Sequence, residues 1–289
     1  MPVSLVLGAS GAVGRFLLPR LRAASHEVLA LSRETHVDGP ALSWLTGDLN
    51  ARMPALPKLD AIFSVGPLDG LARWLPRAVF NGSPRLIALG SMSIVSKRDS
   101  PDAAERAMAE QLELAESALV ETATRRGMNW TLLRPTLIYG AGLDRSLTPL
   151  AHFGLRWRVF PRLWGAAGLR QPVHADDLAT ACLAAFDSPN ANGQTYALGG
   201  GERLALHVML ERVRASLPVA TLPLPLPPIA LRTVARAARF FPRQPLSMAG
   251  VARLHVDLIA DDDAARAALG WAPRAFRPDS GCWVPRSLP

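Results

Sequence analysis

The sequence predicts an α/β protein with a doubly wound parallel sheet, helices on both faces and a smaller C-terminal lobe. Two observations carry this prediction. The first 140 residues alternate short β-rich runs with longer helical patterns, as expected for repeated βαβ units. After Gly140 the pattern loosens, and the run LPVATLPLPLPPIAL at 217–231 holds too many prolines for a regular helix or a central strand.

The expected elements follow from hydrophobic periodicity. Positions 101–127 predict a long amphipathic helix, because apolar residues starting at Met108 and Leu112 recur at steps of four and three. These residues form one stripe along the helix, which continues through Ala115, Leu119 and Thr122. Gly127 fits the C-terminal cap of this helix. The predicted strands are 3–7, 27–32, 41–45, 61–65, 86–89 and 130–134, and the helices predicted for the lobe are 207–216, 230–240 and 262–269.

Composition restricts the class of protein. The chain has 289 residues, enough for a full core, and it shows neither a secretion signal nor the ~20 uncharged residues that span a bilayer. We therefore expect a cytoplasmic protein. Cys182 and Cys282 lack metal-ligand spacing, which predicts two free structural thiols and no metal site.

The net charge of +8 comes from arginines scattered along the chain, without the basic runs or interleaved aromatic residues of a nucleic-acid surface. Such a positive field favours an anionic ligand. The segment IALRTVARAARFF at 229–241 resembles a membrane-surface helix, but a lobe helix with snorkelling arginines is the favoured interpretation.

The stretch GASGAVG places Gly8, Gly11 and Gly14 between the first strand and the first helix. Glycine permits a positive φ and a close backbone approach, and the free N–H groups of the following helix attract phosphate. The spacing is G-x-x-G-x-x-G rather than the familiar G-x-G-x-x-G. At the head of βαβ units it predicts a dinucleotide-binding Rossmann turn. The intervening Ser10, Ala12 and Val13 are expected to border the cofactor with the glycines.

The second strand ends in Ser32 and Arg33, where such a fold meets the adenosine ribose. An acidic residue there accepts from the 2′-hydroxyl of NAD, whereas an arginine pairs with the 2′-phosphate of NADP. We therefore expect NADP, with NAD as the alternative. Glu34 beside Arg33 weakens the signal, and a solvated surface arginine is the other interpretation.

Together these features resemble the extended and atypical short-chain dehydrogenase/reductase family, which includes NAD-dependent epimerases and dehydratases. The motifs that carry the resemblance follow one another in order along most of the chain. They are GASGAVG, GDL (47–49), LIALGSMS, LLRPTLIYG (132–140), VHADDLATA (173–181), GQTYALGGGERL (193–204) and ALGWAPR (268–274).

The resemblance implies a division into a dinucleotide-binding domain (1–140 and 171–200) and a substrate lobe (141–170 and 201–289). It also implies pairing of two copies through long helices such as 101–127. The resemblance also implies a set of cofactor residues. They are Asp48 and Leu49 at the adenine, Val65, Gly66 and Pro67 after the fourth strand, and Pro135, Thr136 and Leu137 at the nicotinamide. Two of them have a structural alternative: Asp48 could cap a turn, and Pro135 could simply end a strand.

Members of this family carry a Tyr and a Lys at i and i+4 on one helix face, where the ammonium lowers the phenol pKa and the Tyr transfers a proton. Counting back from Glu116 and Arg134 places the pair at Met108 and Leu112, so the usual pair is missing. Ser91 and Ser93 at the end of the fifth strand are candidates to orient the reacting oxygen.

Three further residues are considered either for proton transfer or for a purely structural role. Tyr139 is the phenol closest to the expected pocket, and packing is its alternative role. His174 is a candidate acid or base, although a strand end at His174 with an N-cap at Asp176 is the simpler interpretation. The sequence thus predicts an NADP-binding oxidoreductase or epimerase/dehydratase-like enzyme with altered proton transfer. The alternative is a regulatory protein that binds NADP(H) without turnover.

Overall fold

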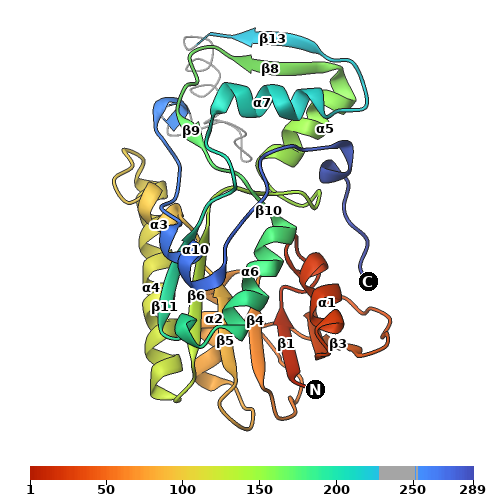
Figure 1. Ribbon diagram of the computed structural model, residues 1–289, viewed down its shortest axis with the longest axis vertical. Helices are drawn as coiled ribbons and strands as arrows, with labels where there is room; N and C mark the ends of the chain where they lie inside the picture. The colour runs from red at the N-terminus through yellow and green to blue at the C-terminus, as the bar shows by residue number, and fades with distance from the viewer. Residues whose placement is uncertain (228–250, 252) are drawn as a thin grey trace.

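A seven-stranded, wholly parallel sheet forms the base of the protein in the computed structural model, which describes residues 1–227, 251 and 253–289 (Figure 1). The strand order is β11-β6-β5-β4-β1-β2-β3, so the winding direction reverses between β1 and β4. In such sheets ligands bind beyond the carboxyl ends of the strands at this reversal. The strands are β1 (Val3–Leu7), β2 (Glu27–Ser32), β3 (Leu42–Thr46), β4 (Ala61–Ser64), β5 (Arg85–Leu89), β6 (Trp130–Pro135) and β11 (Gln194–Leu198).

Helices cover both faces of the sheet because both faces of its central strands are apolar. One buried cluster joins α1 and α6 to one face, and a second joins α2 and α4 to the other. The short helix α3 lies beside α4, between β5 and the lobe (Figure 1). These helices are α1 (Gly14–Ala23), α2 (Leu68–Trp74), α3 (Ser93–Ser96), α4 (Ala103–Arg125) and α6 (Ala175–Asp187).

The lobe stands at the opposite end of the molecule from the N-terminus and has its own buried cluster (Figure 1). Its frame is a two-stranded parallel sheet of β8 and β13 packed with two helices. Its elements are α5 (Leu147–Trp157), β8 (Val159–Leu163), α7 (Leu206–Ala215) and β13 (Leu222–Leu226). Two-residue strands connect it to the base: β7 (Ile138–Tyr139), β9 (Leu169–Arg170), β10 (Val173–His174) and β12 (Leu204–Ala205).

The predicted fold class is confirmed, and the six predicted strands are present with ends shifted by one residue at most. The seventh strand, β11, was not predicted as a strand. The proline-rich run contributes β13, which pairs with β8 outside the main sheet. The predicted helix 230–240 and the arginine-bearing segment 229–241 lie outside the described residues.

Two structural predictions for helices need correction. The N-cap of α6 is His174, whose Nδ1 accepts from the Asp176 N–H at 3.1 Å, so Asp176 lies within the first turn instead of capping it. The apolar stripe of α4 is not buried along its whole length, because Met108 is 46% exposed and the buried line there passes through Glu105 and Ala109.

The division into two domains remains a prediction, with one exception. The helix α10 (Asp263–Leu269) falls in the part expected in the lobe. Its Ala265, together with Trp271, packs in the cluster formed by α1, α6 and the sheet. By its contacts this segment therefore belongs to the base of the molecule.

Candidate functional site

The turn after β1 is so close-packed that only glycine fits at two positions. Gly8 has a φ of +81°, and a Cβ placed there would lie 2.5 Å from the backbone nitrogen of Gly66. A Cβ on Gly14 would lie 2.3 Å from the carbonyl oxygen of Ala9. The backbone of this turn can therefore approach a ligand directly.

The N-terminus of α1 opens onto this turn without a competing anion. Its N-cap, Val13, provides no capping side chain, and the described first turn holds no acidic residue. Arg15 adds a guanidinium, held by donation from Nε to the Ser10 carbonyl at 2.9 Å and by a second bond to the Arg286 carbonyl. Free N–H groups, the helix dipole and this cation together fit the pyrophosphate of a dinucleotide. Ala12 and Val13 pack against the core beneath it.

A cavity of about 570 Å³ lies beyond the ends of β2 and β3 and is lined by Arg33, Asp48 and Arg52. Two guanidinium groups beside one cavity suit a phosphate. Ser32 shapes the backbone here, since its hydroxyl bonds His36 Nε2 at 2.9 Å and accepts from the Glu34 N–H at 3.1 Å.

The residues expected at the adenine and after the fourth strand differ in what they contact. Asp48 caps a turn by accepting from the Asn50 N–H at 2.8 Å, and it lines the cavity as well. Leu49 packs against the core between α2 and α4. Gly66 supports Gly8, Val65 packs on the opposite core cluster, and Pro67 is the exposed N-cap of α2.

A second cavity, of about 510 Å³, lies between the sheet and the lobe. Ser91, Ser93, Pro135, Thr136 and Leu137 all line it, so the structure brings together the residues predicted after the fifth and sixth strands. Ser91 Oγ accepts from the Ser93 N–H at 3.1 Å, which orients this hydroxyl at the start of α3. From the base Lys97 also lines the cavity, and from the lobe and its connecting segments Arg170, Arg253 and Asp257 do so.

Lys97 stands where α3 ends and faces the helix expected to carry the Tyr and Lys. Its Nζ lies 3.1 Å from Met108 Sδ, on the exposed N-terminal half of α4. Burial lowers the pKa of Lys97, and the nearby charge of Arg253 lowers it further. An ammonium therefore adjoins the position at which a tyrosine was expected.

Tyr139 and His174 pack together away from this cavity. Tyr139 is 1% exposed, its ring meets His174 edge-on at 5.1 Å, and burial raises its pKa. His174 uses Nδ1 to cap α6, and burial together with the Arg274 charge lowers its pKa. Asp176 pairs with Arg20 and Arg274, each at 2.8 Å. These contacts give all three residues structural roles, although the capping role expected of Asp176 is taken by His174.

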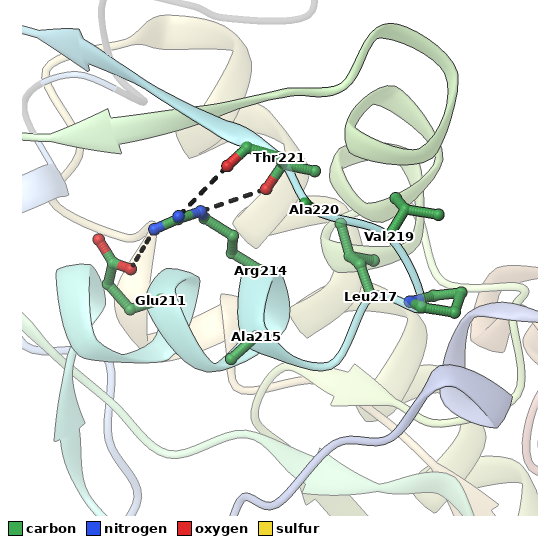
Figure 2. A pocket seen from close by; sticks show the side chains of 8 residues that line it. Glu211, Arg214, Ala215, Leu217, Val219, Ala220 and Thr221 are labelled. Atoms are coloured by element: carbon green, nitrogen blue, oxygen red, sulfur yellow. Dashed lines mark hydrogen bonds and ion pairs between the residues drawn. The ribbon is translucent and has the colours of Figure 1, made fainter.

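A further hollow lies beside α7 and β13, in the lobe (Figure 2). The Arg214 guanidinium there donates to the Glu211 carboxylate at 3.1 Å and to Thr221 Oγ1 and its carbonyl at 3.2 Å each. Aliphatic residues such as Leu217 and Val219 form much of the remaining wall. Because its cation is already bonded to the protein, this hollow lacks a group aimed at a ligand.

Three residues of the candidate site were not predicted from the sequence: Arg15, Arg52 and Lys97. Arg15 directly follows the last glycine of the turn, which was a usable signal. Lys97 is one of two lysines in the chain and follows the candidate serines closely. Arg52 reaches its cavity through a loop, and nothing in its local sequence predicts that placement.

Both cysteines are free and buried, as predicted, and burial raises the pKa of Cys182 to about 12 and that of Cys282 to about 11. Among the described residues, no helix has the length and apolar character to cross a membrane.

Comparison with known proteins finds a partial match in sequence and matches in fold over nearly the whole chain. No family model matches the chain. The chain is 27% identical over 240 residues to the mitochondrial NADH dehydrogenase [ubiquinone] 1 alpha subcomplex subunit 9 of Arabidopsis thaliana, an alignment spanning 72% of this chain and 56% of that protein. The chain thus matches little more than half of that relative.

Solved structures match over nearly the whole chain. MoeE5 in complex with UDP-glucuronic acid and NAD has a TM-score of 0.71 at 17% identity and covers 97% of both chains. UDP-glucuronic acid 4-epimerase from Bacillus cereus, in complex with UDP-glucuronic acid and NAD, has a TM-score of 0.67 at 11% identity and covers 94% of both. The fold is therefore that of the epimerase/dehydratase-type extended short-chain dehydrogenases/reductases, as the sequence motifs predicted.

Proposed function

We propose that this chain binds NADP(H) and is an oxidoreductase or epimerase/dehydratase-type enzyme whose proton transfer does not use a Tyr–Lys pair. One observation carries the proposal: three binding features follow each other along the carboxyl edge of the sheet. Arg33 and Arg52 lie beyond β2 and β3, the glycine turn follows β1, and Ser91 and Thr136 follow β5 and β6 at the second cavity. This order is the one expected for a dinucleotide laid across the carboxyl ends of the strands.

Each feature has a role that its chemistry supports. Arg33 and Arg52 pair with the 2′-phosphate, which accounts for a preference for NADP over NAD. The N–H groups at the start of α1 and the Arg15 guanidinium hold the pyrophosphate. Val65 and Pro135 border the nicotinamide, which when bound supplies or accepts a hydride.

Ser91 is the proposed group for orienting the substrate. Its oxygen accepts the Ser93 N–H, so its own hydrogen is free to donate to a reacting oxygen in the cavity. Tyr139 is assigned to packing, because its buried ring lies among His174 and Phe276.

A regulatory protein that binds NADP(H) without turnover is the second candidate. Met108 and Leu112 favour it, because neither side chain can transfer a proton and they occupy the expected positions on α4. We therefore expect little NADPH oxidation with generic ketones or UDP-sugars, measured by absorbance at saturating NADPH. Rapid NADPH oxidation with either substrate would contradict the loss of the usual machinery.

The cofactor proposal is tested by calorimetric titration with NADPH and NADH. We expect NADPH to bind at least about tenfold more tightly, since a charge-assisted bond contributes ~1.5–3 kcal/mol. Arg33→Ala should remove most of this preference, whereas Arg125→Ala, which deletes an exposed arginine at the far end of α4, should preserve it. Equal affinities in the wild-type protein, or no binding of either nucleotide, would overturn the proposal.

A further inference from the structure

The cavity between the sheet and the lobe has two chemically different walls. The residues that line it from the base include three with hydroxyl groups and one lysine: Ser91, Ser93, Thr136 and Lys97. The side contributed by the lobe is largely aliphatic. The aliphatic residues on this side include Leu147 and Leu150 of α5, Leu163 of β8, and Leu206, Met209 and Leu210 of α7. A ligand that fits both walls has a polar end and an apolar body.

Most charges around the cavity are already satisfied by the protein. The Arg170 guanidinium donates to the carbonyls of Leu169 and Val256, at 2.8 Å each, and of Arg253 at 2.7 Å. Arg253 pairs with the buried Glu105 at 2.6 Å. Asp257 accepts the Leu169 N–H at 2.7 Å. These groups stabilise the cavity wall and leave little capacity for a ligand's charge.

Lys97 is the exception. It is half-buried, and no carboxylate of the described residues forms an ion pair with it. Its Nζ instead contacts the thioether sulfur of Met108 at 3.1 Å, a weak acceptor. A partly desolvated ammonium with so poor a partner gains from an incoming anion.

We propose that this cavity binds an amphipathic carboxylate, with its head on the Lys97 ammonium beside Ser91 and its alkyl chain against the leucines of the lobe. The inference deepens the proposed function by naming the ligand class of the same site, and it rests on that function. The volume of about 510 Å³ falls within the range of small-molecule sites, ~300–1,000 Å³.

The same wall argues against a sugar as the body of the ligand. A sugar ring needs a hydrogen-bond partner for each buried hydroxyl, because an unpaired one costs ~1–3 kcal/mol. Among the described residues that line the cavity there is no Asn, Gln, His or Tyr, and the lobe side presents mainly Leu and Met side chains. An alkyl chain has no hydrogen bonds to lose when it is buried against that surface.

Calorimetric titration of the full chain with octanoate, octanol and acetate, with and without NADPH, tests the proposal. Octanoate should bind, octanol should bind at least about tenfold more weakly, and acetate should give no measurable heat, because head and tail both contribute. Equal affinities for octanoate and octanol would contradict a carboxylate site.

Variants locate the site. Lys97→Met keeps the stem and deletes the charge, so octanoate affinity should fall at least about tenfold while octanol affinity stays constant. Lys97→Arg should retain octanoate binding, and Lys58→Met, at the exposed other lysine of the chain, should change nothing. Leu150→Trp, which fills the cavity, should weaken octanoate and octanol together. Unchanged octanoate binding in Lys97→Met or Leu150→Trp would overturn the assignment.

The two proposals fail in distinguishable ways. NADPH binding without octanoate binding would reject the ligand class alone. Octanoate binding that depends on Lys97 but occurs in a protein with no NADPH affinity would reject the cofactor proposal and retain the carboxylate site.

Discussion

At the glycine turn the proposed binding surface is made of backbone, whereas at the cavity between sheet and lobe the proposed binding surface is made of side chains. Gly8 and Gly14 fix the turn by leaving no room for a Cβ, so almost any substitution there meets another part of the main chain. Lys97 lines the cavity, and Met108 beside it occupies an exposed position on α4. A backbone site therefore restricts its sequence, while a side-chain site can change its chemistry within an unchanged fold.

The largest expected effect is at the turn. Gly8→Ala should destabilise the protein by about 3 kcal/mol, the sum of a left-handed alanine and the overlap with Gly66, and should abolish NADPH binding. Gly127→Ala is the matched control, because Gly127 has a similar φ of +64° but nothing within 4 Å of a Cβ. It should cost only about 1 kcal/mol. Equal losses in urea unfolding would show that strain alone, and not close packing, restricts the turn.

A side-chain pair between β6 and α4 should give the next largest effect. Arg134 on β6 holds the Glu116 carboxylate of α4, with Nε to Oε2 at 2.9 Å and Glu116 5% exposed. Arg134→Met should cost about 2 kcal/mol, because it leaves the Glu116 carboxylate without its partner at a site that the half-buried Arg134 keeps partly open to water. Arg125→Met, which breaks the exposed pair with Glu121, should cost less than about 0.5 kcal/mol. Similar values for the two variants would show that burial does not strengthen the first pair.

Arg52 is the second arginine of the cavity beyond β2 and β3, and removing it tests how much this side chain contributes to NADPH affinity. Arg52→Ala should lower NADPH affinity about fivefold and leave NADH affinity unchanged, since only NADPH carries the 2′-phosphate. Calorimetric titration measures both. A parallel loss of NADH affinity would mean that Arg52 stabilises the loop and does not contact the phosphate.

The smallest expected effect concerns pH. Burial lowers the pKa of His26, which bonds Ser4 Oγ at 2.6 Å, and that of His174. The unfolded chain therefore takes up protons at higher pH than the folded one, so the free energy of unfolding should decrease as pH falls from about 7 to 5. His26→Gln should make this dependence shallower in urea unfolding at several pH values. An unchanged slope would exclude His26 as its source.

How much the sequence predicted also differs between the two regions. The glycine turn was predictable because glycine identity reports backbone geometry directly. The position of Lys97 was not, because it depends on how α3 packs beside α4. Helical periodicity placed Met108 in the core, yet in the first turns of α4 the buried side passes through Glu105 and Ala109, which leaves Met108 exposed. Likewise β11 is as long as β1, but its local pattern was not recognised as a strand.

A crystal structure of the protein with NADPH and octanoate tests the central account most directly. The account predicts the 2′-phosphate between Arg33 and Arg52, the pyrophosphate at the glycine turn, and the carboxylate within hydrogen-bonding distance of Lys97 Nζ. NADPH bound away from the glycine turn, or a 2′-phosphate that contacts neither arginine, would contradict it.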